Sequence, residues 1–287
     1  MDILEMGIKP LVSVLMTSFN REKYISTAIE SVLKSTYQNF ELIIVDDAST
    51  DETVGITNKY AAQDNRIQVY VNQKNLGDYP NRNKAASFAK GKYLKYVDSD
   101  DYIYPNGLET MVNSLEQFPD AGFALCSLKP DAERPFPFSL QPKDAYEYHF
   151  FGPGLFHKGP LTAIFLKSAF DAMGGFKEDR MISDTDMWHR MALNYPVVLM
   201  PDGLVWQRRH EEQELSHQNK FIFEGEKIKW KYLKNPVCPL LPQQLKAIKK
   251  KRLSRYTGFI LSGIRKGNFK QVKTYFKCFR YISIIKI

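Results

Sequence analysis

The first hundred residues alternate between short apolar runs and segments with helical spacing, and this alternation limits the fold more than any other feature. The apolar runs have the length of buried strands and lie at 11–16, 40–46, 67–72 and 92–97. The helical segments lie between them, at 21–37, 51–63 and 76–91, and Gly91 is predicted to end the last one. This spacing predicts the α/β class, with a central, mainly parallel sheet flanked by helices.

Two acidic clusters follow two of the predicted strands. Asp46 and Asp47 end the second strand, and Asp98, Asp100 and Asp101 follow the fourth. Ligands of open parallel sheets bind at the carboxyl ends of the strands, and crowded carboxylates raise one another's pKa unless a cation lies among them. Mg²⁺ and Mn²⁺ bind through one or two carboxylates together with substrate phosphates. The clusters therefore predict metal-assisted phosphate chemistry, and the alternative is a solvated turn whose Asp side chains accept backbone hydrogen bonds.

The pattern loosens after about residue 122. Residues 134–154 are rich in Pro and aromatic residues and predict a long surface loop. Further strands and helices are predicted within 160–176, 184–195 and 197–210. The region 122–162 carries no readable code for a substrate, so the identity of the substrate is not predicted. His149 and His157 in this region are candidates for contacts with a substrate.

Charge divides the chain into two parts. The net charge is +8, but residues 227–287 hold 17 of the 40 Lys and Arg and none of the 32 Asp and Glu. Two apolar stripes at helical spacing run through this tail, at Leu245, Ile248, Leu253, Tyr256, Ile260 and Ile264 and at Phe269, Val272, Phe276, Phe279 and Ile282. We therefore predict a domain at 1–226 and a basic, amphipathic helical extension at 227–287.

The three cysteines, Cys126, Cys238 and Cys278, have neither the spacing of a zinc site nor that of a disulfide framework. This favours a reducing compartment. The N-terminus lacks the pattern of a signal peptide, and no apolar run approaches the length of a membrane span. The predicted location is the cytoplasm, including the inner face of the cell membrane.

Three stretches, 13–53, 75–105 and 174–191, resemble in the correct order the motifs of the family 2 inverting glycosyltransferases of bacterial cell-surface polysaccharide synthesis. The likeness runs from about residue 11 to 210 and does not cover the tail. It implies a GT-A fold and metal-dependent transfer of a sugar from a nucleotide-diphosphate sugar. It also implies a UDP-sugar donor, Mn²⁺ or Mg²⁺ as cofactor, and a glycan or lipid-linked acceptor.

By this resemblance, the nucleotide is bound at the ends of the first two strands. Thr17 and Phe19 match the turn at which an aromatic ring, commonly Tyr in the family, stacks on the base; a place in the core is the alternative for Phe19. Asp47 matches the carboxylate that contacts uracil, and Asp46 is expected to brace the strand end.

The diphosphate and the metal are expected beside the second acidic cluster. Asn81 and Arg82 match a segment in which Arg pairs with diphosphate oxygens, and an Arg on a surface helix is the alternative. Asp98 and Asp100 form the DxD motif. Asp100 and Asp101 are candidate metal ligands, and which Asp binds directly is left open. His210 lies where some relatives place a metal-binding His, and a surface His is the alternative.

Asp184 matches the catalytic base of the family. An acceptor hydroxyl is a weak nucleophile, so a carboxylate takes its proton as it attacks the anomeric carbon, and direct displacement inverts that carbon. The chain departs from the family at Ser183, where Glu is usual. The alternative is that Ser183 and Asp186 form a helix cap and that Asp184 only favours the helix dipole. Trp188 is expected either in the acceptor pocket or in the core.

Several further readings stay open. The Q-x-x-R-W motif of processive polymerising members is absent after Gln207, which favours transfer of a single sugar. Because of Ser183, a catalytically silent relative that binds nucleotide sugar or glycan is the main alternative. A phosphoacceptor receiver domain is a third hypothesis, but such a compact domain would leave most of the chain unexplained.

The tail is expected to bind an anionic membrane rather than nucleic acid, with packing on the acidic body as the alternative. An oligomer is left open.

Overall fold

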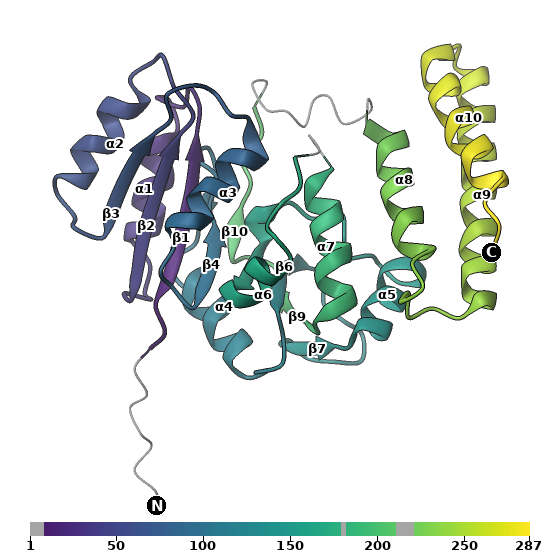
Figure 1. The fold of residues 1–287 in the computed structure, drawn as a ribbon, viewed down its shortest axis with the longest axis horizontal. Coiled ribbons are helices and arrows are strands. Elements are labelled where there is room, and N and C mark those ends of the chain that lie inside the picture. Colours follow the sequence, from purple (N-terminus) through teal and green to yellow (C-terminus); the bar gives the residue numbers. More distant parts are fainter. Residues whose placement is uncertain (1–8, 179–181, 211–220) are drawn as a thin grey trace, which may run out of the picture.

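The structure is a computed structural model that describes residues 9–178, 182–210 and 221–287 (Figure 1). In these residues an eight-stranded sheet has the order β3-β2-β1-β4-β8-β6-β9-β7. The parallel half consists of β3 (Ile67–Val71), β2 (Phe40–Asp46), β1 (Val12–Ser18) and β4 (Tyr93–Tyr96). Val12 pairs with Phe40 on one side and Tyr93 on the other, so the carboxyl ends of these strands meet at one edge. The predicted α/β class is confirmed.

The other half of the sheet is mixed. β8 (Ala163–Leu166) runs antiparallel between β4 and β6 (Phe123–Leu128), and β9 (Val197–Pro201) is parallel to β6. β7 (Phe138–Leu140) forms the edge. A separate ribbon pairs β5 (Tyr102–Ile103) with β10 (Val205–Trp206).

Helices cover both faces of the sheet. They are α1 (Ile25–Leu33), α2 (Thr53–Ala61), α3 (Asp78–Phe88), α4 (Gly107–Glu116), α5 (Pro142–Phe151), α6 (Lys167–Ala172) and α7 (Ser183–Asn194). Because successive side chains of a strand point to opposite faces, Leu42 and Ile44 pack with residues of α1 and α4, whereas Ile43 and Val45 pack with residues of α3. Two buried cores result, one on each face.

The sequence-based predictions need two local corrections. Residues 134–154 are not one long loop, because they contain β7 and α5, and Tyr146 and Phe150 of α5 are buried. Pro142 is the first residue of α5, where its missing N–H costs no hydrogen bond. Gly91 does not end α3, which stops at Phe88. A Cβ at Gly91 would lie 2.5 Å from the backbone N of Ser13, so the glycine permits a close approach to β1.

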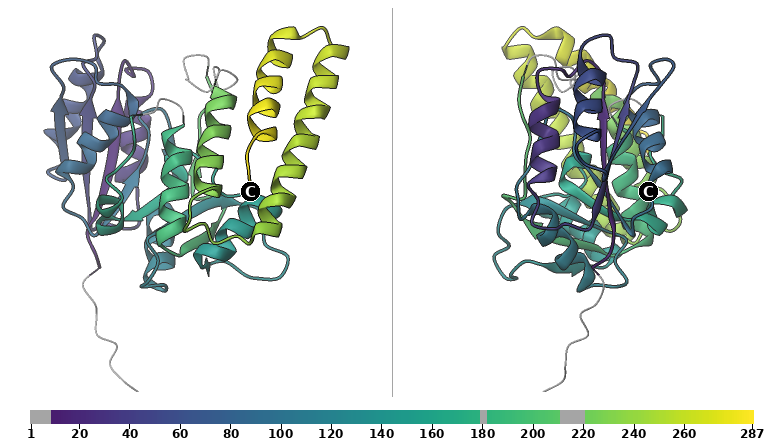
Figure 2. Two further views of the ribbon diagram at one scale, coloured as in Figure 1. Left: turned by 45° about the vertical axis from the view of Figure 1, so that its right-hand side comes forward. Right: turned by 90° about the vertical axis from the view of Figure 1, so that its left-hand side faces the viewer.

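The tail forms three helices, α8 (Ile222–Leu233), α9 (Pro242–Arg265) and α10 (Phe269–Ser283). Figure 2 shows α9 and α10 as an antiparallel hairpin beside α8. The boundary predicted after residue 226 falls inside α8, which the sequence analysis did not identify, and the division into two domains stays a prediction. Trp230, Tyr256 and Ile282 belong to the same buried cluster as residues of α7.

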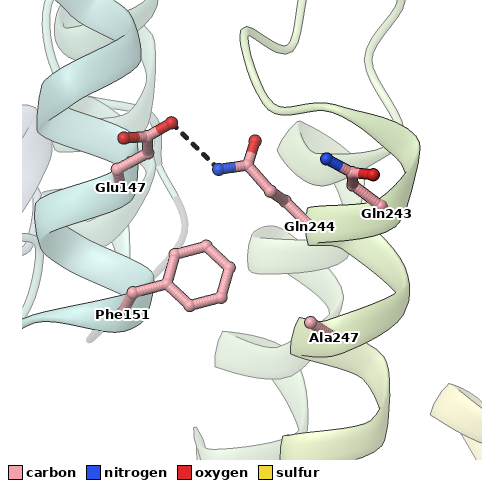
Figure 3. Close-up of a pocket in the computed structure, with 5 residues that line it drawn as sticks. All are labelled: Glu147, Phe151, Gln243, Gln244 and Ala247. Atoms are coloured by element: carbon pink, nitrogen blue, oxygen red, sulfur yellow. Dashed lines mark hydrogen bonds between the residues drawn. The ribbon is translucent and has the colours of Figure 1, made fainter.

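Polar contacts also fix the tail to the body. Arg252 Nε of α9 donates to Glu226 Oε2 of α8 over 2.7 Å, and the Glu226 side chain is buried. In the first turn of α9, Gln244 Nε2 donates to Glu147 Oε1 of α5 over 2.9 Å, beside a pocket of about 440 Å³ (Figure 3). None of the predicted site residues lines this pocket. Within the described ranges, no helix is both long and apolar enough to cross a membrane.

Candidate active site

A buried arginine links the acidic cluster after β4 to helix α3. Arg82 lies between two carboxylates, with Nη1 2.6 Å from Asp98 Oδ1 and Nε 2.7 Å from Asp78 Oδ1. Its guanidinium lies over the ring of Tyr96, 5.5 Å from the centroid, and only 9% of the side chain is exposed. The alternative of an Arg on a surface helix is therefore wrong. Arg82 is a fixed cation at the carboxyl end of β4.

Asp100 has two basic partners from distant parts of the chain. Arg21 Nε, in the turn after β1, lies 3.2 Å from Asp100 Oδ2, and His210 Nε2 lies 3.0 Å from the same atom. The His210 ring also packs on Tyr24, with the ring centroids 4.6 Å apart. The imidazole is only 10% exposed, so the alternative of a surface His is wrong.

Asp101 is the most buried acid of the cluster. Its Oδ1 accepts a hydrogen bond from the backbone N–H of Arg208 over 2.9 Å, which ties the cluster to the segment after β10. Burial, together with the charges of Asp98 and Asp100, raises the pKa of Asp101 to about 8. Arg82 and Arg21 therefore offset the electrostatic repulsion at Asp98 and Asp100. Asp101 instead favours its protonated form in the free protein.

The donor atoms of the cluster suit a hard divalent cation. Asp100 Oδ2 and His210 Nε2 lie 3.0 Å apart. Mg²⁺ or Mn²⁺ in such sites takes one or two carboxylates and completes its shell with phosphate oxygens and water. No three His, Cys, Asp or Glu side chains among the described residues are arranged to hold a metal by themselves. The residues present fit a cation that is bound jointly with a diphosphate.

The predicted nucleotide-binding residues lie at the ends of β1 and β2. Thr17 is partly buried within β1, and Phe19 follows this strand with 43% of its surface exposed. Phe19 is therefore not a core residue, and its ring is available for stacking. Asp46 accepts hydrogen bonds from Ser18 Oγ and from Ser49, which agrees with a bracing role at the strand end.

Asp47 organises the loop that leads into α3. Its Oδ1 accepts from Asn72 Nδ2 and Leu76 N, and its Oδ2 accepts from Gly77 N, all within 2.8 Å. Asn81 continues the network, because it accepts from Asn72 and donates to the carbonyl of Val45. Both predicted residues thus lie at the carboxyl end of β2, where they hold the 72–77 loop in place.

Asp184 begins the first turn of α7 and faces the start of α3. Its backbone N–H donates to Tyr79 Oη over 3.4 Å, and its own Oδ1 accepts from Thr185 N over 2.6 Å. Burial raises the pKa of Asp184 to about 6, and the charge of Asp78 acts in the same direction. A carboxylate in such an environment is a stronger base than an exposed one, as a proton acceptor requires.

The helix-cap alternative for Ser183 and Asp186 is wrong. Ile182 occupies the N-cap position, and Ser183 Oγ donates backwards to the carbonyl of Lys177 over 2.6 Å. Asp186 is buried and accepts hydrogen bonds from Arg190, Lys231 and Tyr232. Burial alone would raise the pKa of Asp186, but these partners lower it. Asp186 therefore joins α7 to α8.

Two further candidates, Trp188 and His149, have structural roles, whereas His157 is exposed. Trp188 is fully buried, stacks on Phe165 and donates through Nε1 to the carbonyl of Lys158 over 2.7 Å, so it belongs to the core. His149 Nδ1 accepts from the backbone N–H groups of Leu155 and Phe156 and holds the turn after α5.

The comparisons with known proteins agree with this arrangement. The pattern that defines Glycosyl transferase family 2 matches residues 13–174, more than half of the chain. The chain belongs to this family. The family predicted from the motifs is therefore confirmed, although Asp184 and the tail lie beyond the matched residues.

Curated relatives match over a shorter stretch. GlyG of Streptococcus pneumoniae is 39% identical over 107 residues, which are 37% of this chain and 36% of that protein. The UDP-Glc:alpha-D-GlcNAc-diphosphoundecaprenol beta-1,3-glucosyltransferase WfgD of Escherichia coli is 39% identical over 105 residues, 37% of this chain and 41% of that protein. The chain thus spans about a third to a half of the curated relatives it matches.

Solved structures extend the likeness to nearly the whole chain. The mannosyltransferase PcManGT from Pyrobaculum calidifontis, in complex with GDP-Man and Mn²⁺, has a TM-score of 0.64 at 16% identity and covers 96% of this chain and 86% of that chain. At this identity the likeness bears on the fold alone, and it confirms the predicted GT-A class with its C-terminal helices.

Sequence reasoning missed several residues of the site. Arg21, Asp78, Tyr79 and Arg208 carry the contacts that connect the predicted residues. Asp78 and Arg82 stand at i and i+4, a spacing that predicts an ion pair on a helix. The contacts of Arg21 and Arg208 with the acidic cluster join distant segments, and no local pattern indicates them.

Proposed function

We propose that the protein transfers a single sugar from a nucleotide-diphosphate sugar, with a UDP-sugar as the leading donor, to a hydroxyl of a glycan or lipid-linked acceptor, with inversion. One observation carries the proposal. Asp184, a carboxylate with a raised pKa, faces the start of the helix from which Arg82 reaches the acidic cluster. The proposed base and the proposed diphosphate-binding residue thus come from opposite halves of the chain.

The donor is proposed to lie across the carboxyl ends of the parallel strands. Phe19 would stack on the base, and Thr17, Asp47 and Asn81 would shape the nucleoside pocket. Arg82 would bind diphosphate oxygens, since a guanidinium suits such oxygens and Arg82 already lies beside Asp98.

A Mn²⁺ or Mg²⁺ ion is proposed to be held by Asp100 and His210 together with the diphosphate. Asp101 remains a third candidate ligand, although its Oδ1 already accepts from the backbone of Arg208. The bound ion would supply Lewis-acid stabilisation of the departing nucleoside diphosphate. PcManGT was solved with Mn²⁺, which supports the proposal of a metal.

Asp184 is proposed to accept the proton of the acceptor hydroxyl. The hydroxyl oxygen would attack the anomeric carbon as the bond from that carbon to the diphosphate breaks, and the proton would pass to the carboxylate of Asp184. Attack opposite the leaving group inverts the anomeric carbon. Burial of Asp184 supports this role because it raises the proton affinity of the carboxylate.

The acceptor is proposed to be lipid-linked, with the basic tail at an anionic membrane surface. The name of WfgD includes a diphosphoundecaprenol-linked sugar as acceptor and UDP-Glc as donor, which supports both assignments by analogy. The concentration of basic residues in 227–287 supports membrane contact independently.

The test begins with the full-length protein and a panel of nucleotide sugars, including UDP-glucose, UDP-N-acetylglucosamine and GDP-mannose, each with Mn²⁺. A bound donor raises the thermal midpoint by mass action, and release of nucleoside diphosphate then measures turnover. Donor-dependent release supports the proposal. Tight binding without release, even over long incubation, would instead support the catalytically silent alternative.

A further inference from the structure

The end of the α9–α10 hairpin exposes a cluster of large apolar side chains. Leu261 and Ile264 in the last two turns of α9 are 58% and 51% exposed, and Phe269 at the start of α10 is 70% exposed. Three exposed bases, Arg265, Lys266 and Lys270, stand among them. We call these six residues of segment 261–270 the hairpin tip.

The hairpin tip takes no part in fixing the tail to the body. The residues that do so, among them Ile248, Tyr256, Cys278 and Ile282, are buried and occupy the inner faces of the two helices. The packing interpretation and the membrane interpretation of the tail therefore concern different surfaces. The inner face holds the hairpin on the protein, and the tip remains available for a second partner.

The position of the tip relates it to the candidate active site. In Figure 1 the turn between α9 and α10 lies at the top, on the side where β1 and β2 end and α7 begins. Figure 2 shows that the tip rises beyond the start of α8. A flat surface laid across the tip on this side would therefore also face the ends of β1 and β2 and the start of α7.

The chemistry of the tip selects one kind of partner. Exposed apolar side chains interleaved with Lys and Arg are the pattern of interfacial elements that enter the headgroup region of a bilayer. No acidic residue occurs anywhere in 227–287, so the tip meets an anionic surface without local repulsion. Each base close to such a surface strengthens binding by about fivefold.

We propose that the hairpin tip inserts into an anionic lipid surface and turns the active site toward an acceptor held in that surface. The inference deepens the proposed function and rests on its lipid-linked acceptor. It replaces contact along the whole tail by contact at one end, with Leu261, Ile264 and Phe269 below the headgroups and Arg265, Lys266 and Lys270 among them.

The test is co-sedimentation of the full-length protein with vesicles of phosphatidylcholine and phosphatidylglycerol at low salt. A tip variant, Leu261→Gln, Ile264→Gln and Phe269→Gln, is expected to lose affinity by about tenfold or more. Its control changes three apolar residues of similar exposure at the other end of the hairpin or in the loop that leads into it, Val237→Gln, Leu241→Gln and Ile284→Gln, which are 68%, 48% and 73% exposed. The control is expected to bind like the unmodified protein.

Two variants that each lose three charges distinguish an effect of the hairpin tip from an effect of total charge. Arg265→Gln, Lys266→Gln and Lys270→Gln are expected to weaken vesicle binding by about tenfold or more. Lys246→Gln, Lys250→Gln and Lys286→Gln remove the same charge from the other end of the hairpin and should change binding by less than about threefold. Equal losses in the two charge variants, or unchanged binding of the apolar tip variant, would overturn the proposal.

Two further readouts keep the inference apart from the proposed function. Release of nucleoside diphosphate with a water-soluble acceptor should be unchanged in the tip variants, whereas transfer to an acceptor embedded in vesicles should fall with vesicle binding. If the tip variants lose transfer to the soluble acceptor equally, the tip is not a membrane device. A tip-dependent dimer in solution that ignores vesicles would assign the surface to a second copy and also overturn the proposal.

Discussion

The carboxylates of the candidate site lie in two opposite environments, one at the ends of β2 and β4, which we call the donor side, and one at the start of α7, which we call the acceptor side. On the donor side, Asp98 and Asp100 have cationic partners, and Asp47 accepts three internal hydrogen bonds. On the acceptor side, burial outweighs the partners of Asp184 and raises its pKa to about 6. Partnered acids are fixed in position, which suits binding. A desolvated acid holds protons more strongly, which suits proton transfer.

The largest expected effect breaks the acceptor side alone. Asp184→Asn removes the proposed proton acceptor but keeps the size of the side chain, so turnover should fall by about two to four decades. The dissociation constant for the donor, measured by titration calorimetry with Mn²⁺, should stay within about threefold, because the residues proposed to contact the donor lie at the ends of β1, β2 and β4.

The matched control is Asp186→Asn on the same helix. Asp186 joins α7 to α8, so Asp186→Asn should lower the thermal midpoint. The turnover of the folded protein should fall far less than in Asp184→Asn. If Asp184→Asn retains near-normal turnover, the base lies elsewhere, and the contrast between the two sides loses its chemical meaning.

The second expected effect breaks the donor side. Arg82→Met leaves Asp78 and Asp98 without the buried cation between them. A fully buried ion pair that loses one partner costs about 3–5 kcal/mol, and because both carboxylates are partly exposed we expect about 2 kcal/mol here. Urea unfolding measures this loss, and donor affinity should fall with it.

The control for Arg82 is another i, i+4 ion pair on a helix of the same domain. Lys34 and Glu30 on α1 are both largely exposed, so Lys34→Met should change the free energy of unfolding by less than about 0.5 kcal/mol. Equal costs at the two positions would mean that the Arg82 pair is no more than a surface pair.

The same contrast explains how much the sequence could predict. The parallel strands and α1 to α3 were predictable because each buries an apolar face whose period is legible in a single chain. The strand order was not, since β8 enters between β4 and β6 through pairings of distant segments. The sequence did not reveal β7 and α5, because β7 is only three residues long and α5 begins at a Pro and has no clear apolar stripe.

For the site, motifs with fixed spacing identified the acidic cluster, Arg82 and Asp184. The partners that decide their chemistry were not predictable, because Arg21 and Arg208 reach the cluster across about eighty and a hundred residues of chain. Burial is likewise a property of the fold, so the raised pKa of Asp184 could be inferred only from the structure.

The third expected effect sharpens the comparison through pH. The pKa of Asp184 is raised from 3.8 to about 6, so this carboxylate is protonated below pH 6 and ionised above it. A proton acceptor works only when ionised. With saturating donor and Mn²⁺, kcat/KM for the acceptor should therefore fall about tenfold for each pH unit below 6 and level off above it. If the same acid limb persists in the residual activity of Asp184→Asn, another group produces it.

The smallest expected effect tests whether the nucleotide base stacks on an exposed aromatic ring of the donor side. Phe19 is 43% exposed in the turn after β1, so its truncation should not disturb the core. Base–aromatic stacking contributes about 1–3 kcal/mol per base, and the exposed position favours the lower end of this range. Phe19→Ala should thus weaken UDP binding by roughly tenfold at an unchanged thermal midpoint, whereas Phe19→Tyr, which keeps the stacking face, should bind nearly as well as the unmodified protein. Equal UDP affinity in all three proteins would show that Phe19 does not contact the nucleotide. Recognition of the uracil base would then be assigned to Asp47 and the 72–77 loop.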